Sequence, residues 1–286
     1  MATLLAVSWT VSLEARAAEP LAERSLVLPD AATAWYQAVH VWQLGDWSNE
    51  HDSAPDHLWL VFHGDIPKYY RTETAPDRSE LDRRLGMRRE TALLVYPISS
   101  QKDWGGARSV PQSMSLGQAT FALIEALSAS YGDPDWAVQT FTFSGAGRVD
   151  LALQRFILSN RNAQREDNML ANRVNELISE HLTAMSAGDA MVSRSMEHPR
   201  DIPNSWIRFL KTYPDVSASF VHDRSSEYPY MFGLASSIGQ AFDPGFKLHR
   251  GESKSIGDGR LRFWAGETHR RAWIGQFSRV FLPDQF

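Results

Sequence analysis

Ser144 has the sequence surroundings of a nucleophile. It ends an alternating apolar run in the stretch "TFTFSGAGR", 140–148, after which apolar residues recur at helical spacing. A serine can be activated on a sharp strand-to-helix turn, which requires small residues two positions before and two positions after it. Those positions hold Thr142 and Ala146, whereas the full motif has glycine at both. The pattern predicts a nucleophile, and the alternative is a glycine-rich turn that binds phosphate through its amides.

Two backbone amides are predicted to form an oxyanion hole beside this serine. On such a turn the amide of the next residue, here Gly145, points to where the tetrahedral oxyanion forms. The stretch "FHGD", 62–65, follows an earlier apolar run, and its His-Gly pair lets the backbone bend. We therefore expect the second hydrogen bond from the amide of Asp65 or Ile66, and we assign His63 to this loop rather than to proton transfer.

His269 is the predicted general base. A serine nucleophile needs an imidazole close to its hydroxyl to accept the proton. Of the nine histidines, His269 in "GETHRRAW" follows the last predicted strand, which fits the chain order serine, acid, histidine. His222 and His249 are weaker candidates. The alternative for His269 is a surface histidine beside two arginines.

The acid that orients the histidine has several candidates. It must come from a loop after a late strand and hold the imidazole in one tautomer. Asp223 ends the stretch "SASFVHD" and Asp189 ends "TAMSAGD", and both satisfy this requirement, with Glu227 as a third choice. For each of them a solvated loop carboxylate is the competing interpretation.

The elements that must position these residues follow from hydrophobic periodicity. Apolar runs at 58–62, 91–99 and 136–143 alternate with helical patterns at 78–90, at 115–132 and after 147. Strands that are apolar on both faces and alternate with helices predict a parallel sheet covered on both sides, with sites at the carboxyl ends of strands. We expect a loop at 102–112. Further strands are expected at 34–44, 181–192, 216–223 and from 259, and further helices at 167–180, 202–215, 230–242 and before 282.

The composition is that of an ordinary globular protein. The chain has 286 residues, of which 43% are hydrophobic and 22% charged, and a formal net charge of −5. The acidic balance argues against a nucleic-acid partner, because such partners favour a concentrated positive field. The absence of cysteine excludes disulfides, thiolate zinc sites and a cysteine nucleophile.

The first 17 residues resemble an export signal. An apolar stretch at 4–13 precedes Ala15-Arg16-Ala17, which fits a signal-peptidase site, although no Lys or Arg lies near Met1. The stretch is too short to span a bilayer, so stable membrane insertion is not expected. The mature chain is expected to be one domain over 18–286 and periplasmic or secreted. The alternative is an ordinary N-terminal segment of a cytoplasmic protein.

Taken together, "LVFHGDI", "LLVYPIS", "FTFSGAGR" and "GETHRRAW" resemble the α/β-hydrolase superfamily over about 57–282. The resemblance implies a three-layer sandwich with a mostly parallel sheet of about eight strands, and helices within 161–215 that cap the site. It also implies acyl transfer through a serine ester without a cofactor or metal. Ser144 would be the nucleophile, His269 the base and Asp223 or Asp189 the acid. Gly145 and Asp65 would form the oxyanion hole.

The sequence thus predicts a serine hydrolase that cleaves a carboxylic ester, or less favourably an amide. The expected partner is a small-molecule, peptide or other acyl substrate, and no oligomeric state is predicted. One rival is a binding protein that keeps this fold without catalysis, with Ser144 retained as a turn residue. A second rival is a protein that binds phosphate at the "SGAG" turn, 144–147.

Overall fold

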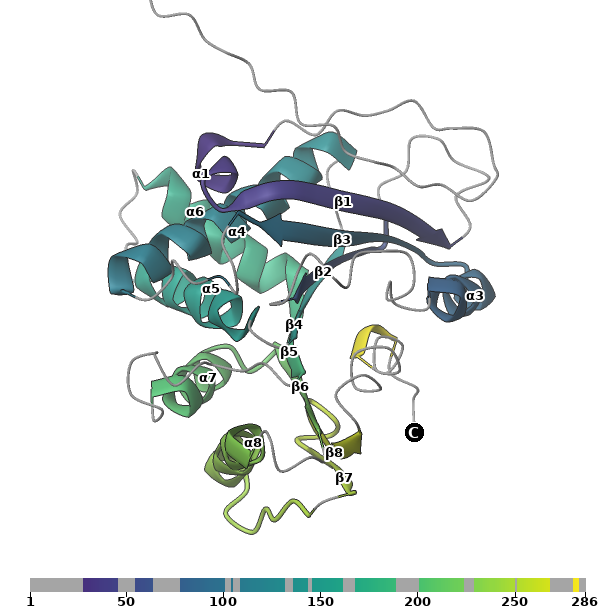
Figure 1. The fold of residues 1–286 in the computed structure, drawn as a ribbon, viewed down its shortest axis with the longest axis vertical. Coiled ribbons are helices and arrows are strands. Elements are labelled where there is room, and N and C mark those ends of the chain that lie inside the picture. Colours follow the sequence, from purple (N-terminus) through teal and green to yellow (C-terminus); the bar gives the residue numbers. More distant parts are fainter. Residues whose placement is uncertain are drawn as a thin grey trace, which may run out of the picture.

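A mostly parallel sheet of eight strands runs through the molecule (Figure 1). The computed structural model describes residues 28–45, 55–63, 78–100, 104, 109–131, 136–143, 146–161, 168–188, 201–223, 229–249, 251–267 and 280–282. The strands lie in the order β1-β3-β2-β4-β5-β6-β8-β7. Their bounds are β1 Tyr36–Gly45, β2 His57–His63, β3 Thr91–Ser99, β4 Ala137–Phe143, β5 Leu182–Gly188, β6 Ser217–Asp223, β7 Ser253–Ile256 and β8 Leu261–Glu267.

The six strands from β3 to β8 are parallel to one another, and only the two edge strands, β1 and β7, are antiparallel to their neighbours. The strands at the centre read as continuous apolar runs because both of their faces are covered. The predicted α/β class and the expectation of about eight mostly parallel strands are therefore confirmed.

Helices cover the two faces unequally. In Figure 1, α1, α4, α5, α6, α7 and α8 lie on one side of the sheet, whereas α3 and residues 280–282 lie on the other. The bounds are α1 Asp30–Thr33, α3 Arg78–Arg88, α4 Val110–Tyr131, α5 Gly147–Asn160, α6 Met169–Glu176, α7 Asp201–Thr212 and α8 Pro229–Phe242, with a π-helical turn, η3, at Leu177–His181. This arrangement is a three-layer sandwich.

Each face of the sheet has its own hydrophobic core. Successive side chains of a strand point to opposite faces, so Phe62 belongs to the core under α4 and α5 while Val61 belongs to the other. On the second face Phe281 stacks against Trp59, with ring centroids 4.9 Å apart. Arg84 donates a hydrogen bond of 2.6 Å to the Leu282 carbonyl, which ties α3 to the C-terminal segment.

Two local predictions were wrong. The loop expected at 102–112 ends earlier, because α4 begins at Val110 instead of 115. Ser109 and Gln112 form a capping box, in which the Ser109 amide donates to Gln112 Oε1 at 3.1 Å and the Gln112 amide donates to Ser109 Oγ at 3.4 Å. The second miss is β7, whose four residues, Ser-Lys-Ser-Ile, are too short and polar to show a strand pattern.

Three further expectations concern regions that the structure describes only in part or not at all. The range 161–215 contributes α6, η3, the central strand β5 and α7, so any cap beyond these elements falls on 162–167 and 189–200, outside the described residues. The expected export signal and most of the expected terminal helix also lie outside them. Of the helices that are described, none is both long and apolar enough to span a membrane.

Candidate active site

Five neighbouring parallel strands end at one edge of the sheet. His63, Phe143 and Gly188, the last residues of β2, β4 and β5, are register partners across these strands. Asp223, the last residue of β6, is likewise paired with Glu267, the last residue of β8. In a sheet of this kind the carboxyl ends of the strands form the usual location of a site.

The main predicted site residues end these strands or follow them closely in the sequence. Asp223 is itself the last residue of β6. Ser144 follows β4 directly, and Asp189 follows β5 directly. Asp65 and His269 each come two residues after a strand, β2 and β8 respectively. Outside the described residues lie Ser144, Gly145, Asp65, Ile66, Asp189, Glu227 and His269, and for Asp223 only the backbone is described.

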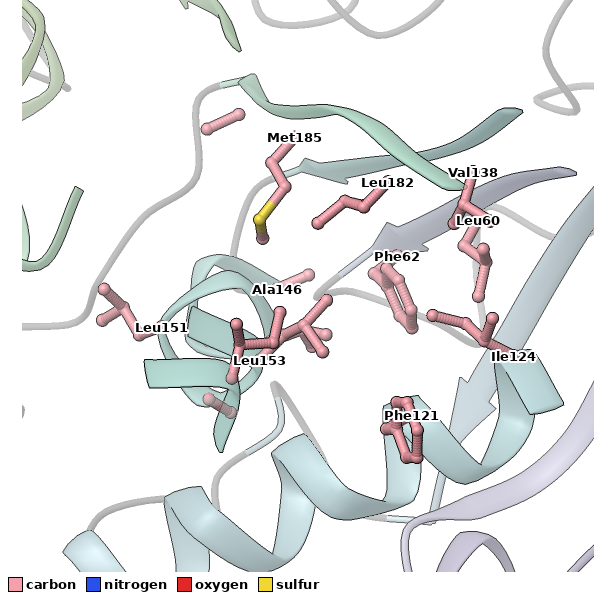
Figure 2. Packing of buried hydrophobic residues seen from close by; sticks show 14 of the residues in the cluster. Leu60, Phe62, Phe121, Ile124, Val138, Ala146, Leu151, Leu153, Leu182 and Met185 are labelled. Carbon is pink, nitrogen blue, oxygen red and sulfur yellow. The ribbon is translucent and has the colours of Figure 1, made fainter. Parts of the chain in front are cut away.

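The strand–turn–helix context expected around Ser144 is present. β4 ends at Phe143 and α5 begins at Gly147, so three residues connect a central strand to a helix of 14 residues. Ala146 is the N-cap of α5 and makes no side-chain capping bond. Figure 2 shows Ala146 within the packed layer between the sheet and the helices, together with Phe62 of β2 and Met185 of β5.

Thr142, which stands where the full motif has glycine, bonds to a buried aspartate. The hydroxyl of Thr142 donates a hydrogen bond to Oδ2 of Asp150, the fourth residue of α5. Both side chains are buried, Asp150 with 1% of its surface exposed. Burial raises the pKa of Asp150 well above its usual value, and the hydrogen bond from Thr142 opposes this only partly.

Asp150 is not among the site residues predicted from the sequence, which gives only a weak indication of its role. The residue is acidic and lies in the first turn of a helix, where a carboxylate on a solvated face is common. However, almost the whole of α5 is buried, including the polar side chains of Arg148 and Gln154. A sequence pattern that assumes one solvated face cannot anticipate this burial.

The two weaker histidine candidates differ sharply in their surroundings. His222 on β6 is 1% exposed, and neither ring nitrogen has a hydrogen-bond partner within the described part of the chain. Burial lowers its pKa to about 3, so the imidazole is neutral and enclosed. His249 is exposed, and its backbone amide donates to Glu252 Oε2 at 2.7 Å.

One cavity formed by described residues lies away from this edge. A cavity of about 460 Å³ lies between α4, α6 and η3, lined in part by Trp136 and His181. These residues directly precede β4 and β5, so the cavity is at the amino ends of the strands. The described residues contain no cluster of three His, Asp or Glu side chains that could hold a metal ion.

The sheet order and the helices on both faces define a three-layer α/β fold with a mostly parallel sheet. No protein-family profile matches the chain, and no curated protein matches it. Among solved structures, an acetyl xylan esterase from Aspergillus awamori is similar with 12% identity and a TM-score of 0.41, covering 80% of this chain and 93% of its own.

A poly(3-hydroxybutyrate) depolymerase from Bordetella parapertussis is also similar, at 11% identity and a TM-score of 0.28. The match covers 74% of this chain and 91% of that protein. At this level of identity and structural similarity, the activity of neither protein is assigned to this chain.

Proposed function

We propose that this chain is a serine hydrolase that cleaves a carboxylic ester. One observation carries the proposal: five neighbouring parallel strands end at one edge, and each ends on, or is followed within two residues by, a candidate group for acyl transfer. Asp189 after β5 and Asp223 at the end of β6 are competing candidates for the same role, that of the acid. Consecutive Cα atoms are about 3.8 Å apart, so chain connectivity tethers these groups to the same edge. An amide is the less favoured substrate.

The strand order supports Asp223 over Asp189 as the acid. Neighbouring strands lie about 4.8 Å apart. β6, which ends at Asp223, is hydrogen-bonded to β8, from which the chain continues to His269. β5, which precedes Asp189, is separated from β8 by β6. An acid must contact the imidazole that it orients, and the shorter path runs from Asp223.

The proposed reaction has two steps. The Ser144 hydroxyl attacks the ester carbonyl while His269 takes its proton, and the amides of Gly145 and Asp65 donate hydrogen bonds to the oxyanion. His269 then returns the proton to the leaving alcohol, which leaves an acyl-serine. Water, deprotonated by the same imidazole, releases the carboxylic acid and restores Ser144. Each oxyanion donor is expected to contribute about 10²–10³-fold in rate.

A fluorophosphonate probe tests this function. We expect the folded protein to be labelled at Ser144, mapped by mass spectrometry, and Ser144→Ala to abolish labelling. Ser179→Ala is the matched control, because Ser179 is exposed on η3 near the opposite edge of the sheet. An unlabelled wild type, under conditions in which a known serine hydrolase reacts, would leave the non-catalytic binding protein as the better interpretation.

The phosphate-binding rival is tested on the same sample. It has some support, because the first amides of α5 receive no side-chain cap. Titration of the unlabelled protein with inorganic phosphate, followed by amide NMR shifts at Gly145 and Gly147, should show no saturable binding if the hydrolase proposal is correct.

We also propose that the mature protein lies outside the cytoplasm, after removal of an export signal. N-terminal sequencing of the protein purified from its natural source would check this proposal.

A further inference from the structure

We propose that Thr142 and Asp150 form a clamp across the nucleophile turn, which makes Asp150 a positioning residue for the reaction of Ser144. The inference rests on the proposed function, because it assumes that Ser144 is the nucleophile. The clamp consists of the hydrogen bond from the Thr142 hydroxyl to Asp150 Oδ2.

The bond joins β4 and α5, the two elements that the connection carrying Ser144 links. Thr142 is the last residue but one of β4, and Asp150 lies in the first turn of α5. Ser144 lies between them in the chain, with Phe143 and 145–149. Fixing Thr142 to Asp150 therefore fixes the separation and orientation of the two ends of the connection that carries the serine.

The strand side of the clamp is held by pairing with a strand on each side. Thr142 is paired with Phe62 of β2 on one side and with Ala187 of β5 on the other. Hydrogen bonds are directional, with a strong preference for a nearly linear donor angle. The hydroxyl of Thr142 thus imposes an orientation on the start of α5, which an apolar contact of the same size would not impose.

Burying the Thr142–Asp150 pair between β4 and α5 is energetically costly. In the described structure Asp150 Oδ1 is buried without a partner. A buried polar group that lacks a hydrogen bond is destabilising, and apolar residues of similar volume are often at least as stable. Costly polar groups next to a site are typical of positions where geometry matters more than stability.

A matched position two residues earlier serves as a control. Thr140 lies on the same face of β4 as Thr142 and is equally buried, but its hydroxyl has no hydrogen-bond partner in the described part of the chain. Removing the Thr140 hydroxyl therefore changes the same layer of the core without touching the clamp.

The test is the kinetics of fluorophosphonate labelling, with the maximal rate of inactivation separated from the probe's affinity. Thr142→Val and Asp150→Leu are expected to fold with a melting temperature at or above that of the wild type. Their maximal labelling rate should fall about 10–100-fold, because a displacement of about 1 Å can cost 100-fold. The probe's affinity should change little. Thr142→Ser and Asp150→Asn, which keep a hydroxyl and an acceptor, should label within about threefold of wild type, as should the control Thr140→Val.

A double variant strengthens the test. If the two side chains act through one bond, the variant with both Thr142→Val and Asp150→Leu should label no more slowly than the slower single variant. Asp150→Leu also tests the clamp by itself if Thr142→Val does not fold.

The outcomes separate this proposal from the proposed function. Equal labelling of Thr142→Val, Asp150→Leu and wild type would overturn the clamp while leaving the hydrolase intact. A loss of labelling in Thr140→Val as large as in Thr142→Val would also overturn it, because the effect would then belong to core packing. A wild type that does not label at Ser144 overturns both, since no nucleophile would remain to be positioned.

Discussion

Asp223 and Glu267 are paired at the carboxyl ends of β6 and β8, two neighbouring parallel strands. The sequence places His269 two residues beyond Glu267. It ranks Asp223 and Asp189 equally as the acid, because each ends or follows a late strand. The strand order distinguishes their positions, since β6 lies next to β8 and β5 does not.

Asp223→Asn should therefore be the damaging replacement. We expect kcat for hydrolysis of p-nitrophenyl acetate to fall about 10³–10⁴-fold, because the imidazole loses the partner that holds its reactive tautomer. Asp189→Asn should cost less than about tenfold by the same reasoning. Steady-state kinetics of the two variants, with Glu227→Gln beside them, decide the assignment. A larger loss in Asp189→Asn or Glu227→Gln would transfer the role to that residue.

His269→Ala should abolish measurable turnover while the fold is retained. Without the base, the serine hydroxyl is not deprotonated during attack, and a loss of several orders of magnitude follows. The control is His249→Ala, because His249 is exposed and its contact to Glu252 is made by the backbone. Circular dichroism and turnover should both be unchanged in the control. Loss of turnover in His249→Ala alone would name that residue as the base.

His222 should make the protein sensitive to acid. Its pKa is about 3 in the folded protein and 6.5 when unperturbed. The unfolded chain therefore binds a proton between these values while the folded one does not, so stability is complete above about pH 6.5 and falls as pH decreases. The slope is about 1.4 kcal/mol per pH unit. Urea unfolding of wild type and His222→Leu from pH 7 to 4 should show a shallower slope in the variant.

Asp150 should have the opposite effect on how the free energy of unfolding depends on pH. Its pKa is raised by burial in the folded protein, so the folded state keeps a proton that the unfolded state loses. The contribution is fully present below the unfolded pKa and is lost as pH rises toward the folded pKa. Asp150→Asn removes this titration, so its advantage over wild type in the free energy of unfolding should grow with pH. An advantage that is constant from pH 4 to 9 would show that Asp150 is not buried as described.

Gly117 allows α4 and α5 to approach closely. A Cβ at Gly117 would lie 2.3 Å from the Ala152 carbonyl oxygen of α5. Gly117→Ala should therefore destabilise the fold by about 1–3 kcal/mol through overpacking. In the control Gly233→Ala, the added Cβ meets nothing within 4 Å, and replacing a helix glycine should stabilise by about 0.5–1 kcal/mol. Thermal unfolding of both variants checks that stability falls in Gly117→Ala and rises in Gly233→Ala.

Much of the architecture is encoded locally. The apolar runs of β2, β3 and β4 are long and continuous, so periodicity alone identifies them and the parallel sheet that they form. The small residues after Phe143 similarly identify a strand-to-helix turn at Ser144, and the structure has β4 and α5 on either side of it. Short or polar elements such as β7 are missed, because their stability comes from pairing with β8 and leaves no pattern in the sequence.

The sequence by itself determined the types of the main elements and supplied the candidate site residues, because both depend on neighbours along the chain. Only the tertiary structure decided which strand lies beside which, and our proposal of Asp223 over Asp189 as the acid rests on that order. It also decided that Asp150 is buried against Thr142. These facts depend on contacts between segments that are distant in the chain, and hydrophobic periodicity carries no record of such pairings.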